Sequence, residues 1–226
     1  MAKESISQED DIKREFNFTT HSIISQVLRG VLVGIFAGLV VGVFRFLIEK
    51  IFHLVQDVYH RSQQSMLWLL ALVLFYCFIV LLNARLVKSE KNIKGSGIPQ
   101  VEAELKGLMS LSWWSVLWKK FVLGILAISS GLMLGREGPS IQLGAMSGKG
   151  VSKFLNLSAA EERALIASGA AAGLAAAFNA PIAGLLFVVE EVYRHFSRFF
   201  WVSTLAASLV ANFVSLSMFG LTPVLD

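Results

Sequence analysis

Residues 62–84 read SQQSMLWLLALVLFYCFIVLLNA, a run of 23 residues without Asp, Glu, Lys or Arg. A helix needs about 20 apolar residues to cross the roughly 30 Å hydrocarbon core of a bilayer, so this run is long enough to span a membrane. Two more charge-free runs, at residues 164–189 and 199–225, contain 26 and 27 residues. We therefore expect an all-α polytopic membrane protein.

The composition of the whole chain supports this fold class. Of the 226 residues 55% are hydrophobic and only 16% are charged, against about 25% charged in an average globular chain. Four prolines and one cysteine exclude a collagen-like or disulfide-rich protein. The net charge of +4 is spread among the apolar runs rather than gathered on one face, so we expect no nucleic-acid partner.

Two further apolar segments are interrupted. Residues 30–48 contain a single charge, Arg45, and glycine recurs at every fourth position, at residues 30, 34, 38 and 42. Small side chains let helices approach closely in lipid, so we expect this helix and the alanine-rich segment 169–184 to pack inside the protein. Residues 121–135 are short for a span and are followed by charge, glycine and proline, which is typical of a broken or re-entrant helix.

The loops indicate the orientation and the domain boundary. The linker at residues 85–94 has a net charge of +3, which places it, and the N-terminus two spans earlier, in the cytoplasm. Residues 1–15 carry a net charge of −2 and no apolar stretch, so they form a solvated tail rather than a signal peptide. We assign residues 1–28 to a cytoplasmic tail with a lead-in segment and residues 29–226 to the transmembrane domain.

The first glycine and proline motif is Lys94-Gly95-Ser96-Gly97-Ile98-Pro99. Serine is a good helix cap, and proline suits a first turn because its missing N–H would be unpaired there, so a helix is predicted to begin near Pro99. The free N–H groups and the macrodipole at such a start favour an anion. An ordinary capped helix start is the alternative interpretation.

The second motif, Gly135-Arg136-Glu137-Gly138-Pro139-Ser140, lies between two apolar stretches. An ionisable residue within a membrane is costly and indicates function by default. A glutamate at a helix start would itself occupy an anion site and would leave it on protonation, giving a pH-sensitive competition with a free anion. The alternative is that Arg136 and Glu137 pair with each other and lie at the membrane interface.

Two charged pairs border the apolar runs and leave alternatives open. The long run at residues 164–189 is broken near Pro181 and ends at Glu190 and Glu191. These two carboxylates either mark the interface or accept protons at the edge of a pathway whose inner end is Glu137. Lys119 and Lys120 either snorkel to the interface or supply positive potential for anions. No metal or enzyme site is expected, because no nucleophile or protease motif occurs and the histidines lack ligand spacing, at His21, His53, His60 and His195.

Three motifs in this order resemble the CLC family of chloride channels and proton/chloride exchangers: GSGIPQVEAEL (95–105), GREGPSIQLG (135–144) and GAAAGLAAAFNAPIAGLLFVVEE (169–191). The resemblance runs from about residue 29 to the C-terminus. It implies a subunit of two inverted halves with anions held at the starts of broken helices, of which this sequence carries the first repeat only.

The resemblance also implies roles for particular residues. The anion-binding set comprises Ser96, Gly97, Ile98, Arg136, Glu137 and Gly138. In it, the Ser96 hydroxyl contacts the central chloride and the N–H groups of residues 136–138 line an outer site. Glu137 is the gating glutamate, and Glu191 is the inner proton-transfer glutamate that exchangers possess and many channels lack.

The implied function is chloride transport coupled to protons. A passive voltage-gated channel is one alternative. A truncated or split fragment that is inactive without its C-terminal half is another, because the family's second half supplies a further helix start and a tyrosine to the chloride site. The implied partners are chloride, protons, the lipid bilayer of a bacterial cell membrane, a second copy bound through the helices at 181–191 and 199–218, and a separate C-terminal half. Chloride is the bound substrate, and no cofactor is expected.

Overall fold

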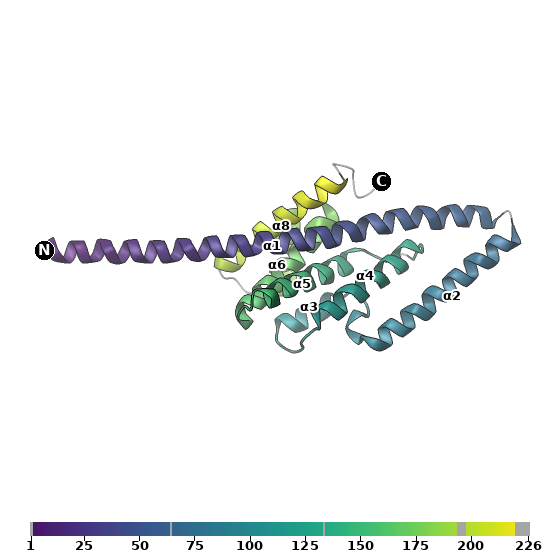
Figure 1. Ribbon diagram of the computed structural model, residues 1–226, viewed down its shortest axis with the longest axis horizontal. Coiled ribbons are helices and arrows are strands. Elements are labelled where there is room, and N and C mark those ends of the chain that lie inside the picture. The colour runs from purple at the N-terminus through teal and green to yellow at the C-terminus, as the bar shows by residue number, and fades with distance from the viewer. Residues whose placement is uncertain (1, 64, 133, 194–197, 220–226) are drawn as a thin grey trace.

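A 61-residue helix, α1 (Ala2–Ser62), runs the length of the molecule and continues from the charged N-terminal segment into the predicted first span. The structure, a computed structural model, describes residues 2–63, 65–132, 134–193 and 198–219. Figure 1 shows the first part of α1 extending beyond the other helices, which gather around its second half. The predicted boundary between residues 28 and 29 falls inside this helix and stays a prediction.

Three of the described helical segments are long and apolar enough to cross a membrane, namely Ile23–Ser62, Met66–Ser89 and Phe200–Met218. The second is α2 (Met66–Ser89), which runs back along α1 from its far end (Figure 1). The third lies in α8 (Arg198–Phe219). These helices contain the predicted apolar runs at residues 30–48, most of 62–84 and most of 199–225.

The remaining apolar sequence is broken into shorter helices. α4 (Trp113–Ser129) and α5 (Glu137–Phe154) are separated by a turn at Gly131, whose φ is 83°, so the helix break predicted for residues 121–135 is confirmed. The charge-free run at residues 164–189 is long enough for one span, but the break predicted near Pro181 divides it. There, α6 (Ala159–Phe178) ends at Asn179 with φ 54°, and Pro181 starts α7 (Pro181–Phe187), followed by the π-helix η2 (Val188–Tyr193). A left-handed residue followed by proline cannot continue an α-helix.

Small residues let the helices pack backbone to backbone, as the sequence predicted. A Cβ on Gly34 would lie 2.6 Å from the Ala207 carbonyl oxygen, and one on Gly38 would lie 2.9 Å from Ala211 Cα, so this stripe of α1 packs on α8. Glycines of α5 and α6 meet in the same way, and most residues of these two helices are buried. The α5–α6 pair is therefore a closely packed part of the protein core.

The start of α6 is also tied to α1. Ser158 and Glu161 form a reciprocal capping box, and Arg29 of α1 donates a hydrogen bond of 2.5 Å to Glu161. The hydrogen bonds from Ser158 and then from Arg29 hold the pKa of Glu161 at about 2. Between α2 and α4, the short helix η1 (Lys91–Ile93) lies within the positively charged linker and α3 (Ile98–Leu105) follows it.

Candidate anion site

The start of α3 is built by two left-handed glycines. Gly95 has φ 73° and Gly97 has φ 100°, values that glycine adopts without steric cost. The backbone N–H of Ile98 points to the Ser96 hydroxyl at 3.4 Å, and Pro99 follows in the first turn. The helix start predicted near Pro99 is therefore confirmed, and Ser96 stands immediately before it.

The start of α5 lies against this turn. Glu137 is the first residue of α5, Arg136 is its N-cap, and Gly138 is buried. A Cβ on Gly138 would lie 2.6 Å from the carbonyl oxygen and 2.7 Å from the Cβ of Ser96. Only glycine permits this approach. The structure thus brings together two motifs that lie about 40 residues apart in the sequence.

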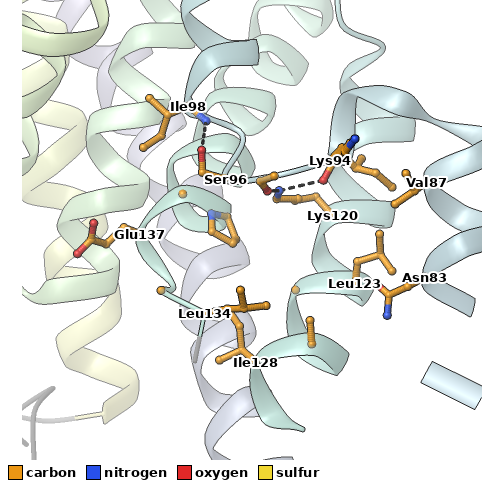
Figure 2. A pocket seen from close by; sticks show the side chains of 17 residues that line it. Asn83, Val87, Lys94, Ser96, Ile98, Lys120, Leu123, Ile128, Leu134 and Glu137 are labelled. Carbon is orange, nitrogen blue, oxygen red and sulfur yellow. Dashed lines mark hydrogen bonds between the residues drawn. The ribbon is translucent and has the colours of Figure 1, made fainter. Parts of the chain in front are cut away.

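A cavity of about 530 Å³ opens beside this contact, bordered by the two helix starts together with α2 and α4. Its lining includes Ser96, Ile98, Lys120, Glu137 and Gly138. Figure 2 shows these side chains around the cavity, with the carboxylate of Glu137 pointing away from Lys120.

Glu137 also borders a second, more apolar cavity of about 280 Å³, whose lining includes Ile141, Leu174, Phe178 and Phe187. The carboxyl-bearing side chain therefore stands between two cavities.

Lys120 supplies a buried cation to the site. Its side chain is 3% exposed, and its ammonium donates hydrogen bonds to the carbonyl oxygens of Gly95 at 2.7 Å and Ile93 at 3.1 Å. Within the described part of the chain its bonding partners are these two carbonyls and no carboxylate. In its protonated form this ammonium adds positive potential to the cavity, which favours an anion nearby.

The neighbouring Lys119 points elsewhere. Its ammonium lies 5.6 Å from the centre of the Trp118 ring. The sequence left both roles open for this pair, and of the two lysines Lys120 is the one that borders the cavity.

Arg136 ties the start of α5 to α1. Its guanidinium lies 3.6 Å from the carboxylate of Glu49, which also accepts a hydrogen bond of 3.1 Å from Arg45. Arg45, the one charge in the predicted first span, is 3% exposed. Neither Gly97 nor Arg136 borders the larger cavity, although both adjoin residues that do.

Glu191 stands apart from these residues. It is exposed on the π-helix η2, together with Glu190, and borders neither of the two cavities around Glu137. The structure therefore brings Ser96, Ile98, Glu137 and Gly138 together and leaves Glu191 outside this group. A proton pathway joining Glu191 to Glu137 stays a prediction.

Comparison with known proteins identifies the family. The family described as voltage gated chloride channel matches residues 77–226, which include the starts of α3 and α5. The chain belongs to this family. It is 40% identical over 157 residues to the H(+)/Cl(-) exchange transporter ClcA of Vibrio cholerae, covering 66% of this chain and 33% of that protein. With the ClcA of Salmonella arizonae it shares 42% identity over 132 residues, covering 58% of this chain and 28% of that protein.

A solved structure shares the fold of this chloride channel family member. The X-ray structure of a slow cyanobacterial Cl-/H+ antiporter matches with a TM-score of 0.81 and 30% sequence identity, covering 88% of this chain and 48% of that one. The chain thus spans about a third of the curated relatives and about half of the solved structure. The helices and the family together make it an integral membrane protein with part of a CLC fold.

Proposed function

We propose that this CLC-family chain binds chloride where α3 and α5 begin and takes part in the exchange of chloride for protons across a membrane. The contact between Ser96 and Gly138, beside the buried ammonium of Lys120, is the observation that carries this proposal. Helix starts carry partial positive charge and free N–H groups, and the charge of Lys120 adds to them. The named relatives, which exchange H+ and Cl−, support chloride as the anion.

Within this proposal Glu137 is the gate. Its carboxylate belongs to the first turn of α5 and borders both cavities, so it competes with chloride for the same N–H groups. Protonation removes the negative charge and with it the attraction to the helix start. Chloride then occupies the outer site lined by the backbone of residues 136–138, while Ser96 contacts the inner ion.

Glu191 is proposed as the proton-transfer group on the cytoplasmic side. Its exposure on η2 is compatible with exchange of protons with water. In the family, exchangers possess a glutamate at this position of the motif and many channels lack it. Passive conduction is the alternative function. The ClcA relatives and the solved antiporter support exchange.

The proposed setting is a bacterial cell membrane with the N-terminus in the cytoplasm. The proposed assembly is a homodimer formed through residues 181–191 and 199–218. Apolar side chains on these helices are exposed, including Ile182 at 64% and Phe213 at 72%. A separate C-terminal half is a further proposed partner, since the relatives are about three times as long as the matched region.

The test measures chloride binding and flux with the same preparation. The purified chain is titrated with chloride by calorimetry and then reconstituted into liposomes, where chloride efflux and proton uptake are recorded together. We expect saturable chloride binding, and proton movement driven by the chloride gradient. Binding without flux would identify a chain that needs its C-terminal partner. A folded helical chain with neither binding nor flux would contradict the proposal.

A further inference from the structure

α3 and α5 are in contact along their length, not only at their starts. Gly97, at the start of α3, packs against Gln142 of α5, and Glu104, near the end of α3, pairs with Lys149 of α5. Gly97 and Glu104 are seven residues apart, and so are Gln142 and Lys149. Seven residues make two turns, so each pair lies on one face of its helix. The two helices therefore run parallel in a register set by two contacts of equal spacing.

The first contact lies beside the anion site. Gln142 is fully buried and donates a hydrogen bond of 2.9 Å to the carbonyl oxygen of Asn92, which precedes α3. A Cβ on Gly97 would lie 2.7 Å from the amide carbon of Gln142, so the backbone of Gly97 rests directly on this side chain.

The second contact is a buried ion pair. The side chains of Lys149 and Glu104 are 4% and 5% exposed, and the lysine ammonium bonds directly to the glutamate carboxylate. Lys149 also donates to the carbonyl oxygen of Leu111 at 2.7 Å and to the Ser110 hydroxyl at 3.3 Å. Glu104 accepts the backbone N–H of Leu111 at 3.3 Å. One ammonium therefore holds both the end of α3 and the segment that follows it.

This ion pair lies away from the anion site but can still affect the position of Ser96. α3 has only eight residues, too few to be stable on its own, so its position depends on its anchors. A shift at its last turn is transmitted along a rigid helix to Ser96. The second contact lies about 10 Å along the helix from the first.

We propose that Glu104 and Lys149 are positioning residues for the anion site. They fix the register of α3 on α5, and thereby the place of Ser96 relative to Gly138, although neither residue borders the cavity. The inference rests on the proposed function, since it assigns the pair an effect on chloride affinity.

The test separates positioning from general stability. Single replacements, E104M or K149M, remove one member of this buried ion pair and lower the thermal stability of the chain. The carboxylate of Glu162 lies 3.9 Å from the Lys149 ammonium and in both variants keeps its ion pair of 2.7 Å with Lys153. The double variant E104M/K149M removes both charges, and replacement of a buried ion pair by apolar residues of similar volume restores stability. The double variant still lacks the hydrogen bond between residues 149 and 104 that fixes the position of α3. We therefore expect it to bind chloride about tenfold more weakly than the parent, a change in binding free energy about equal to one charged hydrogen bond.

The matched control is the exposed ion pair on the same helix. Lys106 lies 3.2 Å from Glu102, with side chains 57% and 27% exposed. The variant E102M/K106M should retain the chloride affinity of the parent. A double variant E104M/K149M that regains both stability and chloride affinity would overturn the inference, because the pair would then be merely structural.

A second readout needs no chloride. In a chain with C77S, the rate at which a small thiosulfonate modifies S96C reports the surroundings of residue 96. E104M/K149M should change this rate, whereas E102M/K106M should not. If E104M/K149M leaves the modification rate unchanged, the positioning role is rejected, whether or not the parent binds chloride. If E104M/K149M changes the rate but the parent binds no chloride, only the proposed function is rejected.

Discussion

Replacing Gly138 by alanine inserts one methyl group into the contact that joins the two helix starts. The new Cβ would lie 2.6 Å from the carbonyl oxygen and 2.7 Å from the Cβ of Ser96. These atoms belong to backbone and to the root of a side chain, so they cannot turn away. The two helix starts must separate, or the strain must be absorbed elsewhere.

The size of the effect follows from this geometry. Ordinary contacts of a Cβ begin near 3.4 Å, so relief requires a displacement of about 0.8 Å. Overpacking of this kind costs about 1–3 kcal/mol in free energy of unfolding. If the starts separate, an anion held by both loses the bonds from one of them, and its affinity falls by about tenfold for each 1.4 kcal/mol.

The assay compares G138A with G135A by chloride calorimetry and thermal unfolding in detergent. Gly135 lies in the same loop, but apart from its chain neighbours no heavy atom of the described residues lies within 4 Å of the position that its Cβ would take. G135A adds a methyl group at the cavity wall without a clash, so it is expected to change stability by less than about 0.5 kcal/mol and to lower chloride affinity less than G138A does. A folded G138A variant that binds chloride as tightly as G135A would refute the proposed joint site.

Three further substitutions test the proposed roles. E137A should abolish the coupling of protons to chloride and flatten the pH dependence of flux, and undiminished coupling in the liposome assay would remove Glu137 from the gate. E191Q should retain chloride movement while losing proton movement, whereas loss of both would indicate a structural residue. K120M should weaken chloride binding by at least about tenfold through loss of the buried charge. K119M should bind chloride with nearly the affinity of the parent. Equal effects of the two lysine variants on the affinity measured by calorimetry would contradict a special role for Lys120.

Much of the helical architecture could be predicted from apolar runs and from glycine and proline. The spans in α1, α2 and α8 follow from charge-free length, and the helix starts after Gly97 and Arg136 follow from local backbone chemistry. The break between α6 and α7 lies at the predicted position near Pro181. Its signals, Asn179 and Pro181, stand inside a charge-free run whose length alone satisfied the requirement for a span.

The contacts that make the site could not be predicted from the residues alone. Ser96 and Gly138 meet because two helices that are separate in the sequence pack side by side, and local patterns carry no information about such pairing. Lys119 and Lys120 differ by one position, or about 100° around a helix, so only the packing of α4 shows which one is buried.

The ion pair of Glu104 and Lys149 illustrates the same limit. Neither residue stands out in the sequence. Glu104 lies on a helix of eight residues, and Lys149 lies in the glycine-rich segment 144–150. Their burial and their shared register emerge only when α3 lies along α5. A charged residue among small residues on a buried helix is the signal that would have pointed to it.

The most direct measurement of the proposed anion site is anomalous diffraction from crystals of the chain grown in bromide. Bromide replaces chloride and is located by its own scattering. The joint helix starts predict an anomalous peak in the cavity beside Ser96 and Lys120, with a second peak at the first turn of α5 when Glu137 is replaced by alanine. An ordered cavity without bromide in both the parent and E137A would contradict the claim that these two helix starts bind the transported anion.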